Sequence, residues 1–337
     1  MRYFNYFMHR FALAFLLCLA TPYANARAVE LKSIALTVSN LDRSVAFYEQ
    51  AMDFKKVSEQ TIVNRDFDYV AGVFGARVHS AVLQLGDEQI QLNQFLSASG
   101  KPIPIDSHSN DLWFQHFAVV VSDMDQAYAR LQSASVAGIS SAPQTIPASN
   151  QAAAGIKAYK FKDPDGHPLE ILYFPSDKGR AKWQGRHDRV FLGIDHTAIT
   201  VADTARSQVF YQDLLGLKVA GGGINSGATQ EQLDNALGAV VRITGLRPES
   251  AQSMGLEFLQ YLTPSGGRPA PVDLQTNDLT HAHIVLHVDD VSGLSEVLAN
   301  KNVTFVSPQT MSVAELKCSK CLMVKDPDGH AVLLVDK

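Results

Sequence analysis

Short stretches in which apolar and polar residues alternate recur along the chain, and stretches with helical spacing follow some of them. In SIALTVS (33–39) every second residue is apolar, whereas in 41–52 the apolar residues recur three and four positions apart. The first pattern is typical of a strand with one buried face, and the second is typical of an amphipathic helix. Two further alternating runs, AVLQLG and QIQLNQF, are separated by a turn and predict antiparallel strands. We expect Asp42 and Asp203 to cap helices of this kind.

The same plan recurs along the chain. Later segments repeat it as HFAVVV, a helix around DQAYARLQSA, then AYKFKDP and PLEILYF. Sequence similarity also relates two halves, because ALTVSNLDRSVAFYEQAMDF resembles AITVADTARSQVFYQDLLGL and DPDGHPLEIL resembles DPDGHAVLLV. We therefore predict an α+β protein of four strand–helix–strand–strand–strand (βαβββ) units. They are arranged as two tandem domains, 31–174 and 193–337, joined by a charged linker at 175–192.

Composition narrows the class of protein. The chain has 337 residues, of which 46% are apolar, and a formal charge of −5, with no basic run that contains aromatic residues. Nucleic acid is therefore not an expected partner. Residues 1–26 combine two arginines, a short apolar run and a small-x-small motif, ANA, which is typical of a cleaved signal peptide. We expect a periplasmic or secreted protein without a stable membrane anchor after cleavage.

Two cysteines near the C-terminus form the motif CSKC. In an oxidising compartment, a disulfide between Cys318 and Cys321 is the favoured interpretation. Free thiols, or a metal or redox role, remain as alternatives. A redox motif normally opens a helix after a strand, whereas strand-like residues follow here.

Four such units resemble the vicinal oxygen chelate (VOC) superfamily, of the glyoxalase, bleomycin resistance and extradiol dioxygenase type. The resemblance covers nearly the whole mature chain. It depends on the two SxxFY helices, on histidines that open strands and on the ending DPDGxxxE. It implies that two units curl their sheets into an open cup. It also implies that the first and last strands of each unit each offer one metal ligand. Alternate strand residues point into a cup, so ligands from different strands can converge.

The eight positions that the resemblance marks are not equivalent in residue type. In unit order they are Ser33 and Gln91, His116 and Glu170, His196 and Glu257, and His283 and Leu333. If each half forms its own cup, neither cup has a complete ligand set. If the two inner units pair, His116, Glu170, His196 and Glu257 meet in one complete site, and the outer cup keeps one strong ligand. We favour the inner pairing. A site of His196, Glu257 and His283 within the second half is the alternative.

Two imidazoles and two carboxylates would suit one divalent ion, Zn²⁺, Mn²⁺, Ni²⁺, Co²⁺ or Fe²⁺. The resemblance implies a metal-dependent isomerase or lyase. Its small-molecule substrate would carry vicinal oxygens and pass through an enediolate, with Glu257 or Glu170 as the proton-shuttling catalytic residue. The alternatives are an Fe(II) extradiol-type dioxygenase and a metal-free binding protein of the bleomycin resistance type. Both a monomer and a homodimer are compatible with the sequence. His167 and His330, which follow the DPDG turns, are expected to be exposed.

Overall fold

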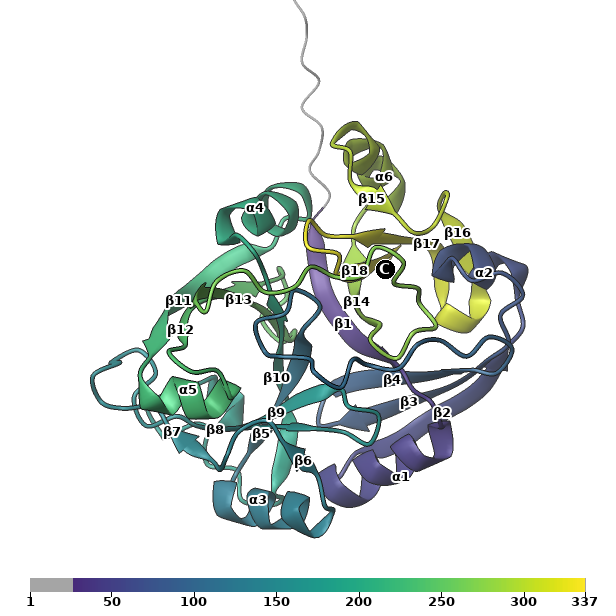
Figure 1. The fold of residues 1–337 in the computed structure, drawn as a ribbon. Helices are drawn as coiled ribbons and strands as arrows, with labels where there is room; N and C mark the ends of the chain where they lie inside the picture. Colours follow the sequence, from purple (N-terminus) through teal and green to yellow (C-terminus); the bar gives the residue numbers. More distant parts are fainter. Residues whose placement is uncertain (1–26, 337) are drawn as a thin grey trace, which may run out of the picture.

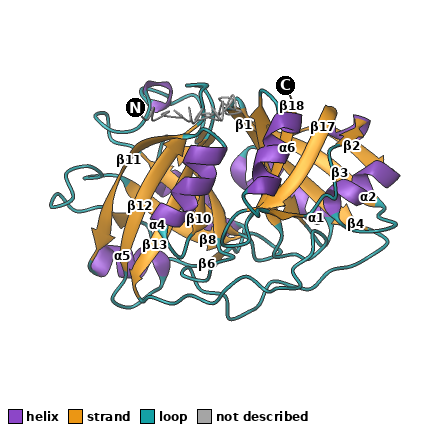
Figure 2. Ribbon diagram, turned by 90° about the horizontal axis from the view of Figure 1, so that it is seen from above, coloured by secondary structure: helices purple, strands orange, loops and turns teal. Residues whose placement is uncertain are grey.

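Two open mixed sheets of nine strands each lie side by side (Figure 1, Figure 2). The computed structural model describes residues 27–336, so the expected signal peptide at 1–26 lies outside the described residues. Within the described part, no helix has the length and apolar character needed to cross a membrane.

The first sheet has the strand order β15-β17-β18-β14-β1-β4-β3-β2, and β16 pairs with β17. Its strands are β1 (Ala28–Thr37), β2 (Lys55–Ile62), β3 (Val78–Leu85), β4 (Glu88–Phe95), β14 (Ala282–Val288), β15 (Thr304–Phe305), β16 (Met311–Val313), β17 (Cys318–Lys325) and β18 (Ala331–Asp336).

The second sheet has the order β11-β12-β13-β10-β5-β9-β8-β6, and β7 pairs with β8. Its strands are β5 (Gln115–Val121), β6 (Ala137–Gly138), β7 (Gln144–Thr145), β8 (Lys157–Lys162), β9 (Pro168–Tyr173), β10 (Phe191–Thr200), β11 (Lys218–Ser226), β12 (Val240–Arg247) and β13 (Gly255–Thr263).

Each sheet combines one unit from each half of the chain. In the second sheet, the first strands of the two inner units, β5 and β10, pair antiparallel. In the first sheet, β1 and β14 of the outer units pair in the same way. The inner pairing of units is therefore confirmed, and the two halves of the sequence do not correspond to the two sheets.

The helices carry the amphipathic segments, and two of them cover the cups: Arg65–Ala71 packs into the outer cup and Ala228–Asp234 borders the cavity of the inner one. They are α1 (Leu41–Met52), α2 (Arg65–Ala71), α3 (Met124–Ser133), α4 (Thr204–Gln208), which continues as the π-helix η2 (Val209–Leu214), α5 (Ala228–Asp234), α6 (Val291–Asn300), and the 3₁₀ turns η1 (Ala181–Trp183) and η3 (Ala314–Leu316). Asp203 caps α4 through the backbone N–H of Arg206. Asn40, rather than Asp42, caps α1, and Asp42 lies in the first turn.

The DPDG turns join the two units of each half. The buried Tyr48 hydroxyl, from the helix of unit one, donates to Asp163 Oδ2 at 3.0 Å. The equivalent Tyr211 donates to Asp326 Oδ2 at 3.2 Å. Each aspartate also accepts two backbone N–H groups of its own turn. These turns therefore pack the two units of each half against each other.

The prediction that the two histidines of these turns are exposed is wrong. His167 and His330 are buried, and their Nε2 atoms lie 2.9 Å from the carbonyl oxygens of Leu279 and Thr200. Leu279 belongs to the half of the chain that does not contain His167, whereas Thr200 and His330 belong to the same half but to different units. His167 therefore links the two halves, His330 links the two units of the second half, and segments distant in sequence cover both residues.

Candidate metal centre

The four residues expected to hold a metal lie on four neighbouring strands of the second sheet. They are His116 on β5, Glu170 on β9, His196 on β10 and Glu257 on β13. Ala198 pairs with His116 on one side and with Glu257 on the other. Ala118 pairs in the same way with His196 and Glu170. Residues that are paired, or two apart on one strand, share a face. All four side chains therefore face into one cup.

Three of the four side chains converge closely. One ligand atom from each of His116, Glu170 and His196 lies within 4.8 Å of the others. His116 Nε2 is 3.2 Å from Glu170 Oε2, and both residues are buried. Glu257 Oε2 lies 3.4 Å from His196 Nε2, but its side chain is 29% exposed. Glu257 is thus the member of the group that borders open space.

The donor set fits a divalent cation. Nδ1 of His116 is buried without a hydrogen-bond partner, and Nε2 has only its 3.2 Å contact with Glu170 Oε2. A buried polar atom without a partner lowers stability. Such an atom in a native structure therefore indicates an additional partner, such as a bound ion. Two imidazoles and a carboxylate, with a second carboxylate beside them, are typical ligands for Zn²⁺, Mn²⁺, Fe²⁺ or Ni²⁺.

The pKa values of Glu170 and His116 favour the protonation states in which these residues bind metals. Burial would raise the pKa of Glu170, but His116 and the charge of Lys160 lower it to about 2, so the carboxylate is ionised. Burial lowers the pKa of His116 to about 4, so the ring is neutral. Ionised carboxylates and neutral imidazoles are the forms that bind metals.

The other two groups retain protons more readily. Burial would lower the pKa of His196, but the carboxylates of Glu257 and Asp195 raise it to about 9. Burial raises the pKa of Glu257, against the positive charge of His196. Glu257 therefore combines access to the cavity with a raised affinity for a proton, which suits acid–base chemistry.

Sequence reasoning missed Asp195, which supports His196. Strict alternation would place two consecutive residues on opposite faces of a strand. However, the β5–β10 register shifts between Ile194 and His196, and such a bulge redirects a side chain. Asp195 Oδ2 lies 3.2 Å from His196 Nδ1. A carboxylate only accepts, so Nδ1 carries the hydrogen when the other ring nitrogen binds a metal.

Lys160 on β8 is a second residue that sequence reasoning missed. It is buried beside Glu170, its register partner on β9, and its Nζ is 2.7 Å from Asp234 Oδ1. Burial would lower the pKa of Lys160, but the charges of Asp234 and Glu170 raise it. Lys160 therefore contributes a fixed positive charge behind the carboxylate of Glu170.

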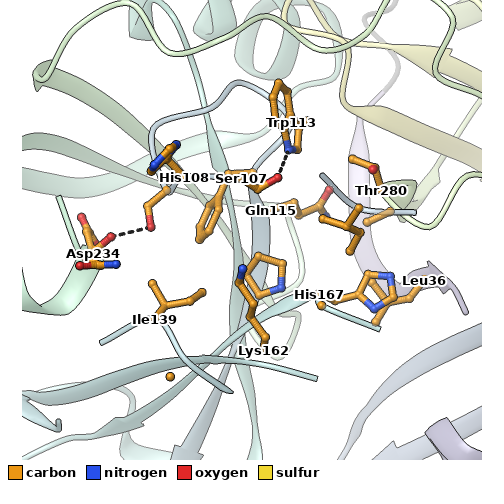
Figure 3. A pocket seen from close by; sticks show the side chains of 18 residues that line it. Leu36, Ser107, His108, Trp113, Gln115, Ile139, Lys162, His167, Asp234 and Thr280 are labelled. Carbon is orange, nitrogen blue, oxygen red and sulfur yellow. Dashed lines mark hydrogen bonds between the residues drawn. The ribbon is translucent and has the colours of Figure 1, made fainter. Parts of the chain in front are cut away.

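The group opens into a cavity of about 450 Å³ in the cup. Glycines form part of its wall, and Gly245 on β12 is the register partner of Glu257. A Cβ at Gly245 would lie 4.0 Å from Glu257 Oε1, so the glycine keeps the space beside this carboxylate open. A second cavity, of about 100 Å³, lies near Trp113 and His167 (Figure 3). None of the four candidate residues lines it.

The first sheet has the same geometry without the ligands. Gln91 and His283 are both paired with Ala35, as Glu257 and His116 are with Ala198. His283 Nδ1 lies 2.9 Å from His281 Nε2, and Gln91 donates to Ser80 Oγ at 3.0 Å.

Apolar side chains fill this outer cup. Leu333 is buried in a hydrophobic cluster that includes Phe67 and Val70 of α2. The cluster also contains Cys318 and Cys321, which are joined by a disulfide as the sequence predicts. The alternative site of His196, Glu257 and His283 is excluded, because His283 lies on the other sheet.

Comparisons with known proteins agree with this architecture. A family model described as the Glyoxalase/Bleomycin resistance protein/Dioxygenase superfamily matches residues 30–171 and again 193–334. Glyoxalase I from Zea mays is similar in structure, with a TM-score of 0.60 at 16% identity over 93% of this chain and 94% of that one.

A putative dioxygenase from Bacillus subtilis subsp. subtilis str. 168 is also similar. Its TM-score is 0.56 at 13% identity, over 92% of this chain and 86% of that one. A comparison with curated proteins finds no match. At these identities the structural likenesses show the fold, while the two matches of the family model together cover most of the chain. The chain belongs to the glyoxalase/bleomycin resistance protein/dioxygenase superfamily, with two tandem VOC domains.

Proposed function

We propose that this chain is a divalent-metal-dependent isomerase or lyase acting on a small substrate with vicinal oxygens. The observation that carries the proposal is the convergence of His116, Glu170 and His196 in one cup, with Glu257 at its open side. The buried Nδ1 of His116, which has no hydrogen-bond partner, supports a metal role for this group. A bound divalent ion would act there as a Lewis acid on a substrate oxygen.

The residues of this chain would divide the remaining work. Glu257 would remove a proton from the hydroxyl-bearing carbon next to a substrate carbonyl, which gives an enediolate, and return it to the former carbonyl carbon. The hydroxyl proton passes to the former carbonyl oxygen, so that one isomer is converted into the other. Its raised pKa and its exposure to the cavity support this role. Glu170 has a pKa of about 2 and lies deeper, so it serves as a ligand and not as the base.

The presence of two carboxylates favours this chemistry over an extradiol dioxygenase. Two histidines and one carboxylate suffice for non-haem Fe(II) oxygen chemistry. Here Glu257 is an additional carboxylate with proton affinity, which an isomerase or lyase needs. The dioxygenase alternative predicts oxygen consumption with a catechol, and the metal-free binding protein predicts no metal at all.

We also propose that the protein works outside the cytoplasm. The signal-like residues 1–26 support this location, and the Cys318–Cys321 disulfide is compatible with an oxidising compartment. Cell fractionation of a tagged full-length chain tests the location. Recovery of the uncleaved chain in the cytoplasm would contradict it.

Elemental analysis of the purified mature protein tests the metal site. We expect about one divalent metal per chain in the wild type and loss of metal in His116→Ala and His196→Ala. His283→Ala, at the matched position of the outer cup, is the control and should keep the metal. Equal metal in all four proteins would refute the site, and no metal in any of them would favour the binding protein.

Glu257→Gln tests the base. Glutamine keeps a ligand oxygen but cannot take up a proton, so the variant should keep most of its metal and lose turnover of the substrate that the wild type converts. Full activity of Glu257→Gln would refute the assignment of the base.

A further inference from the structure

We propose that Arg180 and Arg247 form an anion-binding subsite at one end of this cavity, so that the substrate carries a carboxylate or phosphate group in addition to its vicinal oxygens. The second part of this inference rests on the proposed function. Both arginines line the cavity that contains the candidate metal ligands. Arg180 comes from the linker between the two halves, and Arg247 ends β12.

The linker holds the Arg180 guanidinium firmly at the cavity wall. Its Nη1 donates to the carbonyl oxygen of Ser253 at 2.9 Å, and its guanidinium lies over the Trp183 ring, 5.2 Å from the centroid. Trp183 is fixed in turn, because its indole N–H donates to Asp195 Oδ1 at 2.8 Å. Nη2 of Arg180 is buried and lacks a hydrogen-bond acceptor, and the buried Nε has only a 3.3 Å contact with Asp195 Oδ1. A pre-oriented guanidinium with unused donors is suited to bind an oxyanion.

Arg247, at the end of β12, reaches the same carboxylate as Arg180. Its Nη1 and Nη2 make only long contacts to Asp195, 3.3 Å to the carbonyl oxygen and 3.4 Å to Oδ2. A Cβ on Gly255 would lie 2.7 Å from Nη1, so glycine at this position allows the guanidinium to lie against β13. The side chain of Arg247 is 32% exposed, which leaves donors available to a ligand.

Arg180 and Arg247 contact the same carboxylate at this end of the cavity. Two guanidinium groups share the single carboxylate of Asp195, since Arg180 Nε also lies 3.3 Å from Asp195 Oδ1. Glu88 is nearby but is already paired with Lys182. The two guanidinium groups therefore share one contacting carboxylate, while Glu257 acts on Arg247 only through its charge.

Two charged groups with partial burial and too few acceptors favour an anionic ligand over a neutral one. Asp195 also contacts His196 Nδ1, so the subsite is one side chain away from the candidate metal ligands. A substrate bound at both places would span this short separation. The ligand class that fits is a small organic anion, either a carboxylate or a phosphate ester.

The test is a titration of the mature full-length protein, as purified and after treatment with a chelator. The probes are propionate, inorganic phosphate and propionamide, the last being a neutral molecule of the same shape as propionate. Binding is followed by NMR on the arginine Nε–H signals. We expect propionate, phosphate or both to bind, and propionamide not to bind.

Three variants identify the residues responsible. Arg180→Gln and Arg247→Gln should each weaken anion binding about tenfold or more, because each removes a charge-assisted hydrogen bond to the anion. Arg186→Gln removes a charge from the same linker at an exposed residue paired with Asp188, and should leave binding unchanged. Gly255→Ala keeps both charges but displaces the Arg247 guanidinium, so it should weaken binding as well. Circular dichroism confirms that each variant folds.

The outcomes separate this proposal from the proposed function. Binding of propionate assigns a carboxylate ligand, and binding of phosphate alone assigns a phosphate ester; both support the subsite. Equal affinity in Arg180→Gln, Arg247→Gln and the wild type, or equal binding of propionamide, would overturn the subsite while leaving metal content and turnover intact. Anion binding to the chelator-treated protein would support a subsite that is independent of the metal. Anion binding to a protein that contains no metal as purified would support the subsite and contradict the metal enzyme.

Discussion

Replacing Asp195 with asparagine tests how strongly the carboxylate behind His196 supports the metal centre. The substitution preserves the size of the side chain and an oxygen for the Trp183 indole, but removes the negative charge that faces His196 Nδ1. Burial would raise the pKa of Asp195, but the hydrogen bond and charge of His196, with that of Arg247, hold it well below its usual value. The carboxylate is therefore ionised over the whole neutral range.

Asp195→Asn should weaken metal binding. Removing a partner that orients a metal-binding histidine lowers affinity by about 10–100-fold, which is about 1.4–2.8 kcal/mol. A proton competes for the same ring, because the pKa of His196 in the metal-free protein is about 9. At pH 7 this competition reduces the metal affinity of the wild type. Asp195→Asn relieves part of the competition, so its net loss should be larger at pH 8.5 than at pH 7.

The assay is competition for Zn²⁺ against a fluorescent chelator at both pH values. Asp188→Asn, which removes an exposed carboxylate from the same linker, is the control and should bind like the wild type. If Asp195→Asn had the same Zn²⁺ affinity as the wild type at both pH values, the carboxylate of Asp195 would have no part in metal binding.

Three further substitutions test the packing around the site. Tyr48→Phe removes a buried hydrogen bond to the ionised Asp163 and should lower the free energy of unfolding, measured by urea denaturation, by about 1.5–3 kcal/mol. Tyr69→Phe, at an exposed tyrosine, is the control and should change it little. Equal effects of the two substitutions would contradict a stabilising role of the Tyr48–Asp163 hydrogen bond. Burial would lower the pKa of His167, but Asp163 raises it above 6.5. Protonated His167 therefore stabilises the fold fully below pH 6.5, and this stabilisation is lost as the pH rises through the folded-state pKa. The difference in unfolding free energy between wild type and His167→Gln should shrink above pH 6.5, and a difference that grows there would contradict a raised pKa of His167. Leu333→Ala should cost about 2–5 kcal/mol through a cavity in the outer cup without changing metal content, and loss of metal would contradict the separation of the cups.

The four candidate metal residues could be predicted because the repeat specifies their register. His116 and His196 occupy matched positions in first strands, and Glu170 and Glu257 occupy matched positions in last strands. A period of two then places them on one face wherever the units meet. The pairing of units followed from the same positions, since only the inner pairing completes a ligand set.

The residues that support the site could not be predicted by this reasoning. The direction of the Asp195 side chain depends on a bulge, which interrupts the regular alternation of side chains along β10. Lys160 lies in AYKFKDP, where a lysine between apolar residues resembles one facing solvent, and its partner Asp234 is 74 residues away. Arg180 belongs to a charged segment with the composition of an exposed linker. Burial of these charges depends on long-range contacts.

The exchange of units between the halves has a consequence for how the two cups could diverge. If the two halves were separate, identical chains related by a twofold axis, the cup built from β5 and β10 and the cup built from β1 and β14 would be the same by symmetry. Every substitution would then appear in both. A single chain removes that constraint, so one cup can keep four potential ligands while Leu333 and its neighbours turn the other into a hydrophobic core. Covalent fusion is thus the condition under which this fold can have one reactive centre and one purely structural counterpart.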